Sequence, residues 1–98
     1  MQKEITSIMG YQQITSLSAA TGLTVPSRTS DGQIGSPTQA VIRAETNGVR
    51  FRDDGVTPTA SVGFPLSAGD VLEYDGDLKR IQFIEQTASA TLNVVYYK

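Results

Sequence analysis

Two β-rich segments flank the dipeptide Asn47-Gly48 in the middle of the chain, within residues 39–55. Hydrophobic and polar residues alternate in both segments, and a period of two indicates β-strands. Asn-Gly is the preferred pair for a type I′ turn, because both residues tolerate positive φ angles. The pattern therefore predicts a β-hairpin in which Ala44 faces Phe51 and Glu45 faces Arg50 across the ladder.

The predicted hairpin has one apolar face and one charged face. The apolar face holds Ala40, Ile42, Ala44, Val49 and Phe51, and the charged face holds Arg43, Glu45, Arg50 and Arg52. This division is typical of an antiparallel sheet with one side on the core and the other in water. Two interpretations of the arginines stay open. They form either a solvated surface neutralised by nearby carboxylates or a surface that contacts a partner.

Turn-forming residues recur along the rest of the chain about every 8 to 12 residues, which is the rhythm of a sandwich or small barrel. The extended segments predicted between these turns are 11–18, 23–25, 60–66, 71–74, 78–85 and 90–97. No apolar pattern persists at helical spacing for three turns. The predicted fold class is all-β, a small antiparallel β-sandwich that is jelly-roll-like. An up-and-down barrel is the alternative.

Both ends of the chain contain candidate contact residues. Residues 1–10 are predicted as an N-terminal arm ahead of a single domain, 11–98, and the arm either frays or docks on a neighbouring subunit. In the last strand, alternation places Tyr96 on the core face and Tyr97 on the opposite face beside Val95. Tyr97 therefore either covers the outside of the strand or anchors an interface.

Composition narrows the class of protein. The chain has 98 residues, of which 39% are hydrophobic and 18% charged, and this suits one small domain. A core of that size gives marginal stability, so a homo-oligomer is expected. The net charge of -2 argues against nucleic acid as a partner. No apolar run has the length of a signal peptide core or a membrane span, and no membrane partner is expected.

The residues available for catalysis are few. The sequence has no histidine and no cysteine, and its three lysines are Lys3, Lys79 and Lys98. Paired carboxylates occur at Asp53-Asp54 and in Asp75-Gly76-Asp77, but each pair adjoins a glycine, where aspartate is favoured because it stabilises turns. Neither pair has the spacing of a calcium loop, and no phosphate-binding glycine motif is present. The sequence predicts no enzyme, no cofactor and no metal site.

The segment 49–98 resembles small structural proteins encoded among the head and tail genes of tailed bacteriophages. The resemblance lies in RDDG, a Thr-Pro-Thr segment, G-x-P-L, a Gly-Asp turn, GDL and the closing LNVVYY. Upstream, ITSLSAATGLTVP and AVIRAE agree more loosely. These motifs are mainly turn and core residues, so the resemblance implies a shared β-sandwich more directly than a shared task.

The resemblance implies a virion protein that is made in the host cytoplasm and assembled on the outer capsid surface. The expected function is that of a decoration or cement protein, a dimer or trimer that bridges subunits of the major capsid protein. The candidate contact residues are Ile5, Ile8, Tyr11, Arg43, Arg50, Arg52 and Tyr97. The alternatives are a tail or head-fibre component that binds host glycan, a stand-alone carbohydrate-binding module, and a carboxylate-dependent hydrolase.

Overall fold

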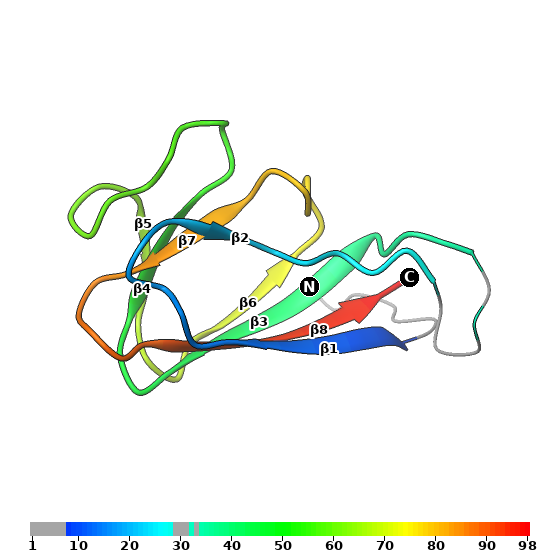
Figure 1. The fold of residues 1–98 in the computed structure, drawn as a ribbon, viewed down its shortest axis with the longest axis horizontal. Helices are drawn as coiled ribbons and strands as arrows, with labels where there is room; N and C mark the ends of the chain where they lie inside the picture. The colour runs from blue at the N-terminus through cyan, green and yellow to red at the C-terminus, as the bar shows by residue number, and fades with distance from the viewer. Residues whose placement is uncertain (1–7, 29–31, 33) are drawn as a thin grey trace.

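The computed structural model describes residues 8–28, 32 and 34–98, which form two four-stranded antiparallel sheets (Figure 1). The first, called the long sheet, contains β1 (Ile8–Ile14), β8 (Thr91–Tyr97), β3 (Gln39–Glu45) and β6 (Val71–Tyr74), in that spatial order. The second, called the short sheet, contains β2 (Thr21–Gly22), β7 (Gln82–Glu85), β4 (Val49–Arg52) and β5 (Phe64–Leu66). The described part of the chain contains no helix long and apolar enough to cross a bilayer.

The order of the strands is that of a jelly roll. The chain passes between the sheets at almost every connection, and β4–β5 is the one consecutive pair of described strands that share a ladder. An up-and-down barrel would instead pair each strand with the next along the chain. The predicted all-β, jelly-roll-like sandwich is therefore confirmed, and the barrel alternative is wrong.

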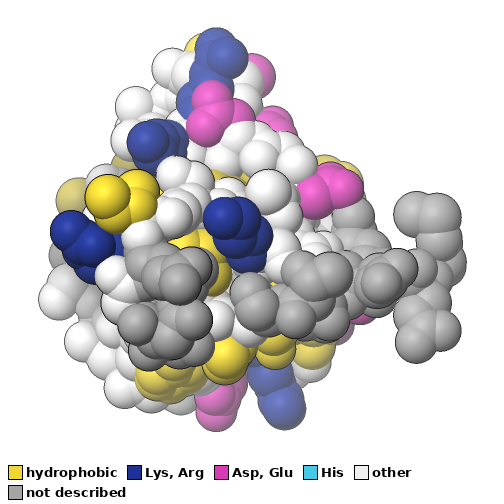
Figure 2. All heavy atoms as spheres, turned by 90° about the vertical axis from the view of Figure 1, so that its right-hand side faces the viewer, with side chains coloured by type: hydrophobic (Ala, Val, Ile, Leu, Met, Phe, Trp, Pro, Cys, Tyr) yellow, Lys and Arg dark blue, Asp and Glu magenta, His cyan; other side chains and the backbone are white. Residues whose placement is uncertain are grey.

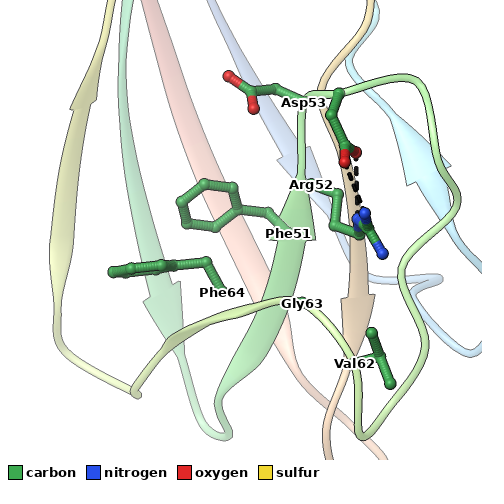
Figure 3. Close-up of a pocket in the computed structure, with 7 residues that line it drawn as sticks. Phe51, Arg52, Asp53, Val62, Gly63 and Phe64 are labelled. Atoms are coloured by element: carbon green, nitrogen blue, oxygen red, sulfur yellow. Dashed lines mark hydrogen bonds and ion pairs between the residues drawn. The ribbon is translucent and has the colours of Figure 1, made fainter.

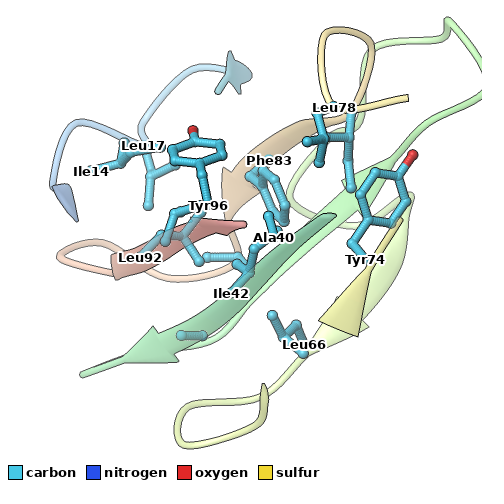
Figure 4. Packing of buried hydrophobic residues seen from close by; sticks show 14 of the residues in the cluster. Ile14, Leu17, Ala40, Ile42, Leu66, Tyr74, Leu78, Phe83, Leu92 and Tyr96 are labelled. Atoms are coloured by element: carbon cyan, nitrogen blue, oxygen red, sulfur yellow. The ribbon is translucent and has the colours of Figure 1, made fainter. Parts of the chain in front are cut away.

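The core lies between the inner faces of the two sheets (Figure 4). Alternate residues of the central strands point into it, including Ala40, Ile42 and Ala44 of β3. In β8 the inward residues are Leu92, Val94 and Tyr96, and the predicted position of Tyr96 on the core face is confirmed. The short sheet contributes Val49, Leu66 and Phe83, while Leu17, Leu78 and Ile81 enter from the connections.

The predicted hairpin over 39–55 is wrong. β3 pairs with β6 and β8 in the long sheet, whereas β4 pairs with β5 and β7 in the short sheet, so the chain crosses from one sheet to the other at Asn47-Gly48. The positive φ angle of this connection is at Thr46, where φ is 70°, and not at the two residues of a type I′ turn. The side chain of Asn47 donates to the Ala88 carbonyl at 2.7 Å, and the Gly48 carbonyl accepts from Gln86 N–H at 3.0 Å. The connection is thus held against the β7–β8 loop.

Other predicted elements are close to the observed ones. The strand at 71–74 is confirmed, and the extended segment predicted at 60–66 contains β5, which is an edge strand of the short sheet. The segment predicted at 23–25 is displaced, because the short strand β2 lies at Thr21–Gly22. β1 begins at Ile8, so the last three residues of the predicted arm belong to the sandwich, and residues 1–7 lie outside the described part.

Candidate functional site

The outer face of the long sheet is the first candidate site. Its composition follows from the ladder register, because residues opposite one another in a sheet share a face. Ile8 of β1 faces Tyr97 of β8. In the next outward row, Tyr11 faces Val95, which in turn faces Val41 of β3. The outward-facing residues of these four strands are Ile8, Tyr11 and Gln13 in β1, Thr91, Asn93, Val95 and Tyr97 in β8, Gln39, Val41, Arg43 and Glu45 in β3, and Val71 and Glu73 in β6.

Five of these residues form a contiguous apolar group, here called the outer stripe. They are Ile8, Tyr11, Val41, Val95 and Tyr97. Ile8 is 49% exposed and Tyr11 60% exposed, and the other three are half-buried beside them. The long sheet forms the lower side of the molecule in Figure 1, and Figure 2 shows hydrophobic side chains along the same lower margin with charged side chains beside them. Apolar groups gathered on one face are characteristic of contact surfaces.

A polar network borders the outer stripe and fixes the Tyr11 ring. The Tyr11 hydroxyl donates to the Asn93 side-chain oxygen, which also accepts from Gln13 Nε2 at 3.2 Å. The Asn93 amide donates to the Glu45 carboxylate. Arg43 lies on the same face, opposite Asn93 in the β3–β8 ladder. The surface therefore combines an apolar stripe with hydrogen-bonding and charged groups of both signs.

The predicted contact residues divide between the two sheets. Ile8, Tyr11, Arg43 and Tyr97 share the outer face of the long sheet, while Ile5 lies outside the described residues. Arg50 and Arg52 belong to β4 in the short sheet, so the predicted joint surface of three arginines is wrong. The sequence analysis did not identify three residues of the long-sheet face, which are Val41, Val71 and Glu73. Alternation could have shown that they point outward, but not which strands lie beside them.

Arg50 and Arg52 hold the connection between β4 and β5. Arg50 Nε donates to the Ala60 carbonyl at 3.2 Å, and its Nη1 donates to the Gly63 carbonyl at 2.7 Å. Arg52 makes a two-point ion pair with Asp54, at 3.1 Å from Nε to Oδ1 and 2.5 Å from Nη2 to Oδ2. Hydrogen bonds from the Arg52 guanidinium lower the pKa of Asp54 to about 2. Both guanidinium groups therefore order the loop.

A pocket lies beside this loop at the end of the short sheet (Figure 3). Its volume is about 400 Å³, and its lining residues are Phe51, Arg52, Asp53, Asp54, Val62, Gly63 and Phe64. The Phe51 and Phe64 rings project to the same side of β4 in Figure 3, with centroids 5.4 Å apart and planes inclined by 44°. The sequence did not indicate this pocket, because it forms where the β4–β5 connection folds back over the strand end.

The carboxylates considered for catalysis make structural contacts. Asp53 accepts from the Tyr74 hydroxyl at 2.9 Å, and Asp54 accepts from Arg52 and from Val56 N–H. Asp77 accepts from Lys79 N–H at 3.1 Å, which is a turn interaction. The described residues contain no group of three or more acidic, histidine or cysteine side chains placed to hold a metal ion.

Comparisons with known protein families, with curated proteins and with solved structures give no match to this chain. The resemblance of 49–98 to bacteriophage structural proteins therefore stays a prediction from the sequence.

Proposed function

We propose that this protein is a non-enzymatic virion protein of a tailed bacteriophage that decorates the outer capsid shell as a dimer or trimer. In this proposal the outer face of the long sheet contacts the major capsid protein. The observation that carries it is the outer stripe, an apolar and aromatic surface on three paired strands. The resemblance of the C-terminal half supplies the class of partner.

A surface of this kind suits binding to a repetitive shell. Its side chains are mounted on a sheet, so little conformational freedom is lost when a partner covers them. Tyr11 is already held by Asn93, and exposed aromatic residues are frequent anchors of protein interfaces. A small domain offers a modest contact area, but several linked copies on one shell raise the overall affinity. Because the protein would bind the assembled lattice, it would also stabilise that lattice by mass action.

The test is co-sedimentation of the purified protein with genome-filled or expanded capsids that lack it, together with capsid survival on heating. We expect saturable binding that raises the temperature at which the shell disrupts. Tyr11→Asp introduces a charge into the outer stripe and should weaken binding by about tenfold or more. Val56→Asp is the matched control, because Val56 is 50% exposed but lies in the β4–β5 connection.

Circular dichroism and thermal melts establish that both variants fold. The proposed contact surface would be contradicted if the wild-type protein did not bind capsids, or if the two variants bound equally well. Recovery of the protein on purified tails instead of capsids would indicate that it is a tail component.

A further inference from the structure

The pocket beside β4 and β5 is independent of the outer stripe. None of its lining residues belongs to the long sheet, so a partner that covers the outer face of that sheet leaves the pocket open. Its volume of about 400 Å³ falls within the range of small-molecule sites. Ligand binding in this pocket would be a second activity, and it would not depend on the proposed capsid contact.

One wall of the pocket is an aromatic platform. Phe64 is 67% exposed although it is a large apolar side chain, and Val62 nearby is 52% exposed. The Phe64 ring packs against the Phe51 ring. The Phe51 ring in turn packs against the buried Phe83 ring, with 5.7 Å between the Phe51 and Phe83 centroids. The exposed ring is thus supported by the hydrophobic core. It presents a fixed apolar face to the solvent.

Polar groups line the pocket on both sides of β4. In Figure 3 Asp53 points to the side of the two rings, and Arg52 points to the other side, where it is paired with Asp54. Asp53 accepts one hydrogen bond from Tyr74, and a carboxylate has room for about four, so it keeps acceptor capacity. The polar group beside the rings is therefore a hydrogen-bond acceptor.

The loop that lines the pocket is held by hydrogen bonds. Thr59 and Val62 exchange backbone hydrogen bonds of 2.9 and 3.2 Å. The carbonyl of Gly63 is bound by Arg50, and a Cβ at Gly63 would lie 3.1 Å from Arg50 Cβ and 3.2 Å from the Phe51 carbonyl oxygen. Loop and strand thus approach each other as closely as a glycine permits. A pre-formed pocket costs less to occupy than one that must first be ordered.

We propose that this pocket binds a neutral saccharide ring, with one C–H face stacked on Phe64 and with hydroxyl groups bonded to Asp53. A pyranose has one apolar face and a hydroxyl-bearing edge, and this matches an aromatic wall with a carboxylate on the same side of β4 (Figure 3). An apolar peptide side chain would strip water from the Asp53 carboxylate without replacing those hydrogen bonds. An anion would be repelled by the Asp53 carboxylate.

The test is NMR titration of the isotopically labelled full chain with the methyl glycosides of glucose, galactose, mannose and N-acetylglucosamine. Choline chloride and an N-acetylated leucine amide are added as the cationic and apolar probes. We expect at least one glycoside to shift amide signals of residues 51–64, with a Kd on the order of 1 mM for so small a ligand.

Phe64→Ala should weaken that binding by about tenfold or more, and Asp53→Asn should weaken it as well. Val71→Ala is the matched control, because Val71 is 55% exposed but lies on the long sheet, and it should bind like the wild type. Thermal melts check that each variant is folded. Phe64→Ala should also bind capsids like the wild type, which separates this inference from the proposed function.

Four results would overturn the saccharide site. They are no response to any glycoside, shifts that map to the long sheet, tighter binding of choline or of the leucine amide, and unchanged glycoside binding by Phe64→Ala.

Discussion

Glycines with positive φ angles differ in how much space surrounds them, and this decides what a side chain would cost. Gly63 has φ of 147° and is crowded by Arg50 and Phe51. Gly69 has φ of 90°, and a Cβ added there would have no atom of a non-adjacent residue within 4 Å. Both positions disfavour an L-residue for backbone reasons. Only at Gly63 is a steric clash added.

Gly63→Ala should therefore destabilise the protein by about 2 to 3 kcal/mol, and Gly69→Ala by about 1 kcal/mol. Urea unfolding followed by circular dichroism measures both free energies of unfolding. Gly63→Ala should also weaken glycoside binding, because it pushes the loop away from β4. An equal loss of unfolding free energy in the two variants would show that Arg50 and Phe51 do not crowd a side chain at this position.

At the scale of elements, the connection between β3 and β4 decides how the sandwich is built. Thr46 is exposed and has φ of 70°, a conformation that costs a β-branched residue roughly 1 to 2 kcal/mol. In a two-residue hairpin closed at Asn47-Gly48, Thr46 would instead be an extended strand residue. The two arrangements make opposite predictions for glycine at this position.

Thr46→Gly should stabilise the protein by about 0.5 to 1 kcal/mol, because relief of the backbone strain exceeds the greater flexibility of glycine in the unfolded chain. Thr87→Gly is a comparison at an exposed threonine without a positive φ angle, and it should be neutral or destabilising. Chemical denaturation measures the free energy of unfolding of both variants. A loss of stability in Thr46→Gly would favour a hairpin closed at Asn47-Gly48 over the observed crossing between sheets.

At the scale of the whole molecule, a few polar contacts join the two layers besides the hydrophobic core. The Tyr74 hydroxyl, from the edge of the long sheet, donates to Asp53 at the end of β4 in the short sheet. Burial and this hydrogen bond raise the pKa of Tyr74 to about 12. Burial raises the pKa of Tyr96 to about 12 as well.

Both phenols favour the protonated form in the folded state, since their pKa values lie above the usual value of 10. Their contribution to stability is complete below pH 10 and is lost as the pH rises from 10 through 12. Each phenol should lower the free energy of unfolding by at most about 1.4 kcal/mol per pH unit in that interval.

Urea unfolding between pH 8 and 11.5 measures this decline in the wild type and in Tyr74→Phe. The variant should lose about 1 kcal/mol at neutral pH, where the Asp53 hydrogen bond is removed, and should decline less steeply above pH 10. Identical slopes in the two proteins would contradict a raised pKa at Tyr74.

Local patterning in the sequence was enough to show which residues point inward and where most strands lie. Alternation in β3, β4 and β8 separates Ala44 and Val49 from Arg43 and Arg50 whatever the strands pair with, because the direction of a side chain is a local property of the extended backbone. Turn residues likewise placed the strand at 71–74 and the terminal strand. The same alternation placed Arg43 and Tyr97 on outward faces, whereas Ile8 was predicted in the arm and not in a strand.

Which strands are neighbours could not be read from that pattern and depends on the folded chain. A hairpin and a crossing between facing sheets bury the same residues, since the inner faces of two packed sheets point toward each other. The choice depends on backbone pairing of β3 with β8, some 50 residues away, and of β4 with β7. Because of those long-range ladders, the residues of the outer stripe lie together on the long sheet, and Arg50 and Arg52 lie on the short sheet. The pocket forms where β4 extends beyond β5.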